Sequence, residues 1–268
     1  MLIVKESPQS FEEIVTYVLP SVIAIAVGSD NNGRPIIEGT GFAVEHSGIF
    51  ATCWHVASKY KKLSLLGEDE VREQNMQDNF LRIAVRLKNG SYKWRKVEKR
   101  TLMIDTAENH DLCVFRLIDV AIPPLALHHD DSFNLGAEVG VIGFPMGNKL
   151  QGDVLRPYVI KTVISGALEY TMQDDTKTPQ VALGTLISNG FSGGPVFSTT
   201  DGKVMGMVRS QKYERDEADL SAFVKMPAGI SLAIVPSLIA KGMHDLYKIS
   251  TENIQGALWP DIYPEKID

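Results

Sequence analysis

A serine set among glycines is the first feature of the sequence that could do chemistry, in the stretch GFSGGP at 190–195. A serine hydroxyl becomes a useful nucleophile when a base takes its proton, and the oxyanion that forms needs fixed hydrogen-bond donors. Glycine lets the backbone fold tightly enough to aim its N–H groups at one point. We predict Ser192 as nucleophile and Gly190, Phe191 and Ser192 as the oxyanion loop, with the N–H groups of Gly190 and Ser192 as donors. The alternative is a glycine-rich turn between two strands.

Two further segments offer a base and a carboxylate. His55 follows an apolar strand in TCWHVA (52–57), and Asp111 heads the apolar strand DLCVF (111–115). A triad carboxylate must be buried, so that its hydrogen bond fixes the imidazole tautomer and stabilises the imidazolium. Asp111 meets this need better than other aspartates nearby, so we predict His55 as general base and Asp111 as its orienter. The alternatives are a core or surface histidine and a turn aspartate.

The chain order of these residues narrows the class of enzyme. His, Asp, Ser is the order of the chymotrypsin-type double barrel, whereas subtilisin-like enzymes run Asp, His, Ser and α/β-hydrolases run Ser, Asp, His. The α/β-hydrolases also need a strand–Ser–helix elbow, but here Ser192 is followed by Pro195 and another strand. The pattern favours a chymotrypsin-like serine hydrolase.

The elements that must position these residues are mostly short strands. An amphipathic helix is expected at residues 9–19, with Ser10 and Glu13 as a capping box and Pro20 ending it. A closing helix is expected to start at Pro236. Strands are expected at 21–28, 40–54 (as two), 82–98 (a hairpin about Asn89-Gly90), 112–118, 138–144, 158–170, 181–187, 195–198, 203–208 and 230–235.

These elements predict an all-β fold of two tandem β-barrels with short helices at the two ends of the chain. The joint at Pro123-Pro124 falls between Asp111 and Ser192, so the cleft would lie between barrels. The expected boundaries are a helical segment at 1–19, a first barrel with His55 and Asp111 at 20–125, a second barrel with Ser192 at 126–235, and a helix and tail at 236–268. Residues 59–80 are expected to form a helical or mobile insertion.

Composition excludes several classes of partner. The net charge of −6 and pI near 5.6 argue against general binding of nucleic acid or anionic membranes, and the basic run Lys93–Arg100 is best explained as a solvated hairpin face. No apolar run is long enough for a membrane span, and the N-terminus does not resemble a secretory signal. The two cysteines predict a cytoplasmic protein with free, inward-facing thiols. No metal site or other cofactor is expected, and His110, His128 and His129 are expected at the surface.

Several segments resemble the trypsin-like peptidases, and most closely their high-temperature-requirement (HtrA, Deg) branch. The match runs from about Pro20 to about Pro236, and no PDZ-like domain is expected after it. It is carried by GTGF at 39–42, ATxxHV at 51–56, DLxV at 111–114, VIGFPMG at 141–147 and GKVMG at 202–206. The resemblance implies two six-stranded barrels and a serine endopeptidase that acts on polypeptides, with a regulatory partner or a homo-oligomer as further candidates.

The resemblance also implies where specificity would be set. The residue six before the nucleophile, Leu186, would lie at the base of the primary pocket, with Val208, Arg209 and Ser210 along its wall. A leucine there offers no partner to a buried Lys or Arg charge, so cleavage after small or medium aliphatic residues is expected. Phe191 stands where trypsin-like zymogens carry an aspartate, so activity should not await cleavage at the N-terminus.

Two other functions remain open from the sequence. A double barrel can serve as a catalytically silent binding module, a pseudoprotease. The same acyl-transfer machinery also serves esterases and small-amide hydrolases.

Overall fold

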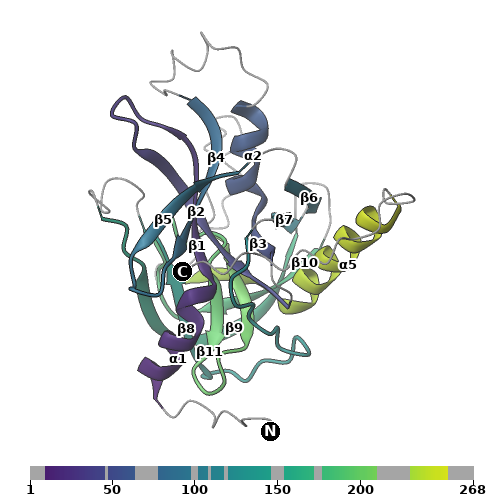
Figure 1. Cartoon of the computed structure of the whole chain (residues 1–268). Helices are drawn as coiled ribbons and strands as arrows, with labels where there is room; N and C mark the ends of the chain where they lie inside the picture. The colour runs from purple at the N-terminus through teal and green to yellow at the C-terminus, as the bar shows by residue number, and fades with distance from the viewer. Residues whose placement is uncertain are drawn as a thin grey trace, which may run out of the picture.

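The computed structural model describes residues 10–45, 48–63, 78–97, 102–107, 110–117, 120–145, 154–171, 177–209 and 230–252. Two β units lie one above the other, with a helix from each end of the chain at their sides (Figure 1). The elements are α1 (Phe11–Val18), the 3-10 turn Leu19–Ser21, β1 (Val22–Ser29), β2 (Pro35–Ala43), β3 (Ile49–Cys53), α2 (Trp54–Leu63), β4 (Asp78–Arg86), β5 (Tyr92–Lys96), β6 (Leu102–Ala107), β7 (Leu112–Leu117), β8 (Glu138–Gly143), β9 (Tyr158–Thr171), β10 (Lys177–Leu183), β11 (Pro195–Ser198), β12 (Val204–Arg209), β13 (Ser231–Ile234) and α5 (Pro236–Glu252).

The first unit is an antiparallel sheet in the order β5-β4-β1-β2-β3-β7-β6. Its interior strand β1 is rich in Val, Ile and Ala and is buried along its whole length. Such residues suit a pleated strand that packs on both faces. In the β4–β5 hairpin, Gly90 has a φ of +85°, a conformation that glycine adopts without a steric penalty. This unit brings the end of β3 beside the start of β7.

The second unit is a closed six-stranded barrel in the order β10-β13-β12-β11-β8-β9. Its interior is filled by aliphatic side chains, among them Val141, Ile164, Leu183 and Val208. The all-β double-barrel prediction is confirmed. The first sheet has seven strands where six were expected, because β6 forms from a segment that shows no strand pattern of its own.

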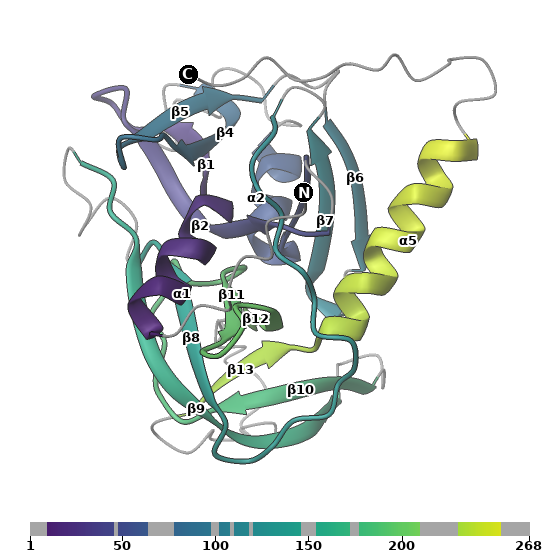
Figure 2. The same ribbon diagram turned by 60° about the horizontal axis from the view of Figure 1, so that its bottom comes forward.

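The two end helices tie the units together. Helix α1 begins at the predicted capping box of Ser10 and Glu13, and its Phe11 ring stacks on Phe197 of β11 at 6.3 Å. Helix α5 packs on β6 and β7 of the first unit, where a Cβ on Gly242 would meet Val114 at 2.9 Å (Figure 2). The first element of the chain therefore contacts the second unit, and the last element contacts the first unit.

Three expected boundaries are wrong. Trp54 begins helix α2 rather than ending a strand, because Asp111 accepts the N–H groups of the first turn. Strand β10 runs over 177–183 and leaves the sheet at Gly184, so most of the expected strand at 181–187 is irregular. The expected insertion at 59–80 begins inside α2 and ends inside β4, and residues 64–77 lie outside the described residues. No helix in the described part of the chain is long and apolar enough to cross a membrane.

The contact between α1 and β11 generates a stability prediction at Gly140 of β8. A Cβ there would run into the Phe197 ring and would approach Phe11 to 2.9 Å. We expect Gly140→Ala to lower the free energy of unfolding by about 1–3 kcal/mol, as overpacking a filled site does. Gly166→Ala in β9 is the matched control, because its Cβ would meet only Ala182, at an ordinary 3.6 Å. Equal denaturant midpoints for the two variants would contradict this packing.

Candidate active site

His55 is held at the start of a helix by a residue distant in sequence. It lies in the first turn of α2, directly after β3. Its backbone N–H donates to Asp111 Oδ1 at 2.9 Å, and the Trp54 N–H donates to the Asp111 carbonyl at 2.9 Å. A carboxylate at a helix N-terminus satisfies N–H groups that have no partner within the helix, and the helix dipole favours its charge. Asp111 therefore caps the helix that carries His55.

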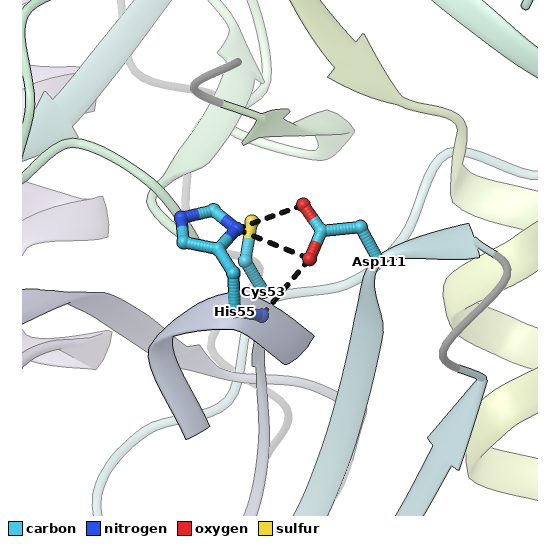
Figure 3. A group of neighbouring side chains, drawn as sticks. All are labelled: Cys53, His55 and Asp111. Carbon is cyan, nitrogen blue, oxygen red and sulfur yellow. Dashed lines mark hydrogen bonds and ion pairs between the residues drawn. The ribbon is translucent and has the colours of Figure 1, made fainter. Parts of the chain in front are cut away.

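The same carboxylate also holds the imidazole ring (Figure 3). Nδ1 of His55 lies 2.9 Å from Asp111 Oδ2 and 3.1 Å from Oδ1. With Oδ1 already accepting the His55 N–H, the ring is fixed relative to its own backbone. A carboxylate on Nδ1 selects the tautomer whose Nε2 can accept a proton. The predicted base and orienter are thus in contact.

Asp111 is itself held in an uncommon backbone conformation. Its φ is +55°, a region that residues other than glycine adopt rarely and at a cost of about 1–3 kcal/mol. The preceding residue, His110, makes a 2.8 Å hydrogen bond through Nδ1 with Thr178 Oγ1 of β10. Half-buried His110 is therefore a link between the two units rather than the surface residue expected from the sequence.

The loop that carries Ser192 is fixed by contacts from both units. Thr40 of β2 donates its N–H to the Ser192 carbonyl at 2.9 Å and its hydroxyl to the Gly190 carbonyl at 2.7 Å. On the other side, the Gly193 N–H donates to the Val208 carbonyl of β12 at 2.8 Å. Gly193 has a φ of +82°, and any Cβ there would collide with Thr40. Only glycine fits this position.

The Ser192 loop packs against the segment that carries His55. A Cβ on Gly193, the residue after Ser192, would collide with the Thr52 hydroxyl and meet the Cys53 backbone nitrogen at 3.0 Å, in the strand that leads to His55. Ser192 is 3% exposed, and its hydroxyl makes no hydrogen bond with His55 within the described residues. Catalytic hydrogen bonds are often long before substrate binds. The structure brings the loop and the histidine segment together without joining the two side chains.

The three N–H groups of the predicted oxyanion loop, residues 190–192, differ in whether they have a hydrogen-bond acceptor. The Phe191 N–H donates to the Ser188 carbonyl at 3.4 Å, and the Phe191 ring packs on Gly143. The N–H groups of Gly190 and Ser192 have no acceptor among the residues described, and Gly190 has a φ of +96°. These are the two donors expected from the sequence. Phe191 supports the loop by packing.

The residues expected around the primary pocket lie differently. Leu186 is 67% exposed, whereas a pocket base must be covered. Val208 is fully buried in the second barrel and contacts the Ser192 loop through its backbone. Arg209 is directed at Asp111, with Nε 3.3 Å from Oδ2, and Ser210 lies outside the described residues. The assignment of these residues to a primary pocket stays a prediction.

Cys53 lies beside His55 and Asp111 in Figure 3, but its thiol is buried and unreactive. Its thiol is fully buried and donates to the Val208 carbonyl at 3.2 Å. Burial raises the pKa of Cys53 well above its usual range, and the charge of Asp111 raises it further. A thiol that stays protonated is not a nucleophile.

A second group of side chains, His128, His129 and Asp130, lies on the connection that precedes the second barrel. The Asp130 carboxylate accepts hydrogen bonds from the hydroxyl and N–H of Ser132, which lower its pKa, and it pairs with His129 at 2.8 Å. Its oxygens are thus already satisfied within the chain. His129 is exposed, as expected, and His128 is half-buried.

The comparisons with known proteins identify the family. A model of the trypsin-like peptidase domain matches residues 39–207, more than half of the chain. The chain therefore belongs to the trypsin-like serine peptidases, and its relatives lie in the HtrA/Deg branch that the sequence motifs indicated.

Two curated relatives are each named probable periplasmic serine endoprotease DegP-like. The one from Hahella chejuensis is 25% identical over 200 residues, and the one from Pseudomonas savastanoi pv. phaseolicola is 26% identical over 204 residues. These matches cover 75% and 76% of this chain but only 35% of each relative, so the chain spans about a third of their length.

A solved structure has the same fold. It is Rv3671c from Mycobacterium tuberculosis, an inactive form in which a serine is replaced by alanine. It superposes with a TM-score of 0.58 at 16% identity, covering 88% of this chain and 90% of that chain.

The expectation of a cytoplasmic protein is wrong. Both curated relatives carry the name of a periplasmic protease. The expectation rested on the first residues of the sequence and on the scarcity of cysteine. Scarcity of cysteine does not exclude export, because a barrel with a large apolar core needs no disulfide to be stable.

The burial of the cysteines generates a chemical prediction. Thr52 and Cys113 are paired across β3 and β7, so Cys53, one residue on, faces the opposite side of the sheet from Cys113. We expect titration in denaturant without reductant to count both thiols, and native protein at pH 7 to react with iodoacetamide at Cys53 far more slowly. Cys53→Ala is the control that identifies the slow group. Rapid native alkylation of Cys53, or a count of zero, would contradict the structure.

Proposed function

We propose that this chain is a serine endopeptidase in which Ser192 forms an acyl-enzyme, His55 is the general base and Asp111 orients the base. The observation that supports this most directly is that Asp111 contacts His55 twice. Its carboxylate accepts the His55 backbone N–H and lies 2.9 Å from Nδ1 of the ring. A structural histidine needs no such fixed tautomer. Here the fixed ring lies on the segment against which the Ser192 loop packs.

The proposed reaction assigns one step to each of these polar groups. Nε2 of His55 accepts the Ser192 hydroxyl proton as the oxygen attacks the substrate carbonyl. The N–H groups of Gly190 and Ser192 stabilise the oxyanion, which needs preorganised donors in a site shielded from water. The imidazolium then protonates the leaving amine, and water hydrolyses the acyl-enzyme by the reverse sequence. Substrate binding would close the hydrogen bond between Ser192 and His55.

Polypeptides are the proposed substrates. Membership of a peptidase family supports this class, and the curated relatives are named endoproteases of the periplasm. We propose the same compartment for this chain. The proposal also includes a homo-oligomer neighbour or a regulatory partner. Packing of Phe191 on Gly143 supports the oxyanion loop, and a loop held by packing can be stabilised further by a molecule that binds beside it.

One observation favours a second candidate function. The hydroxyl of Ser192 and the ring of His55 are not hydrogen-bonded to each other within the described residues. A double barrel whose nucleophile never engages its base would bind polypeptides without cleaving them.

Replacing the nucleophile separates the two candidates. We expect wild type to react with a fluorophosphonate at Ser192 and to digest an unfolded protein, and Ser192→Ala to lose both, with turnover reduced more than about 10³-fold. Ser165→Ala, at an exposed serine of β9, is the matched control and should behave as wild type. Undiminished digestion by Ser192→Ala would exclude the assigned nucleophile. Wild type that binds an unfolded chain but neither labels nor digests would establish the binding module.

Changing the orienter tests the role of Asp111 apart from folding. In Asp111→Asn the amide oxygen can still accept the His55 N–H, so α2 keeps its cap, but the amide cannot select the reactive tautomer as a carboxylate does. We expect kcat to fall on the order of 10⁴-fold, as for the same change in another serine peptidase. Loss of the pair with Arg209 should lower the thermal midpoint, and circular dichroism at the assay temperature should show that the variant is still folded. Wild-type kcat in a folded Asp111→Asn protein would refute the orienting role.

A further inference from the structure

Arg209 contacts the predicted orienter Asp111 rather than lining an open pocket, and the inference drawn from it rests on the proposed function. It is the last residue of β12, and its side chain is only 11% exposed. Its Nε lies 3.3 Å from Asp111 Oδ2, the oxygen that also faces His55 Nδ1 at 2.9 Å. One carboxylate oxygen therefore serves an imidazole of the first unit and a guanidinium of the second.

The negative charge of the Asp111 carboxylate needs a positive charge close to it. The Asp111 side chain is 11% exposed, and an ionised carboxylate removed from water must be paired to be tolerated. A neutral imidazole donates a hydrogen bond but no charge. The Cys53 thiol is neutral, and Lys59, on the helix of His55, is paired with Glu38. Among the described residues, Arg209 is the permanent cation in contact with Asp111.

We propose that Arg209 is a positioning residue that supplies the counter-charge of Asp111. With the carboxylate already paired, the His55 ring rests neutral, which is the form that can accept the Ser192 proton. Without the guanidinium, Asp111 would favour the protonated form of the ring, and less of the base would be free to accept the Ser192 proton. Arg209 acts on the reaction through Asp111 and does not contact substrate.

The strand that carries Arg209, β12, also makes a hydrogen bond with the Ser192 loop. The carbonyl of Val208, the neighbouring residue, accepts the Gly193 N–H at 2.8 Å and the Cys53 thiol at 3.2 Å. The end of β12 therefore fixes the loop of Ser192 and the carboxylate of Asp111 together. This gives Arg209 a different role from the pocket wall suggested by family resemblance, and the two roles predict different kinetics.

Arg209→Met removes the charge and keeps much of the volume, and Arg209→Lys keeps the charge. We expect Arg209→Met to lower kcat on an unfolded-protein or peptide substrate about 10- to 100-fold, a part of what proton transfer contributes, with KM changed less than about twofold. Arg209→Lys should recover most of the loss. Lys203→Met, which breaks an exposed pair with Asp201 just before β12, is the control and should leave kcat unchanged. In an Asp111→Asn background, Arg209→Met should cause no further loss.

A raised KM with unchanged kcat would overturn the proposal in favour of the pocket wall. So would a loss that adds to that of Asp111→Asn, or equal losses in the Met and Lys variants. Circular dichroism and thermal unfolding of each variant identify any protein that fails to fold, and Arg209→Lys then carries the test.

The charge of the His55 ring can be measured without turnover. The ¹⁵N chemical shifts of the imidazole at pH 7, assigned with His55→Ala, should report a neutral ring in wild type and Arg209→Lys and a protonated ring in Arg209→Met. If these ring charges are found but the wild-type protein has no peptidase activity, the counter-charge role is supported and the proposed peptidase function is wrong. A neutral ring in Arg209→Met from an active enzyme would overturn the counter-charge role alone.

Discussion

The site depends on one buried carboxylate. Asp111 accepts the backbone N–H of His55, contacts its ring nitrogen at 2.9 Å, and lies 3.3 Å from Arg209. Each contact has a different effect: by accepting the His55 N–H the carboxylate caps α2, its contact with Nδ1 fixes the orientation of the ring, and its contact with Arg209 pairs its charge. An aspartate with a φ of +55° is costly to maintain, so the surrounding contacts must over-determine it. Other features of the fold can be understood as the means of holding this residue.

The two barrels meet through directed polar contacts set in a continuous apolar core. His110 bonds Thr178 across the units, and Thr40 of the first unit bonds the carbonyls of Ser192 and Gly190. Phe144, Phe197 and Ile234 of the second half belong to the same apolar cluster as the strands of the first. Helices α1 and α5 each lie against the unit remote from them in sequence. Such cross-contacts limit how far the Ser192 loop can move relative to His55.

Residue types and chain order were enough to predict the double barrel, because alternating strands and turn glycines are local signals. They also predicted the contact of His55 with Asp111. The helix at Trp54 was missed because its cap, Asp111, lies far along the chain. The role of Arg209 was missed because an arginine at a strand end shows nothing locally of the carboxylate it will meet. The surroundings of Leu186 could not be predicted, because irregular segments depend on tertiary contacts that no short pattern encodes.

The central claim is that Asp111 holds His55 so that its ring can serve Ser192. A crystal structure of wild type with a peptide boronate tests this most directly, because boron mimics the tetrahedral intermediate. The account predicts a covalent bond to Ser192 Oγ, an oxygen within about 2.7–3.1 Å of the Gly190 and Ser192 N–H groups, and Nε2 of His55 within hydrogen-bond reach of the adduct. The contact between Nδ1 and Asp111 should be unchanged. An adduct on another residue, or a His55 ring turned away from Asp111, would contradict the account.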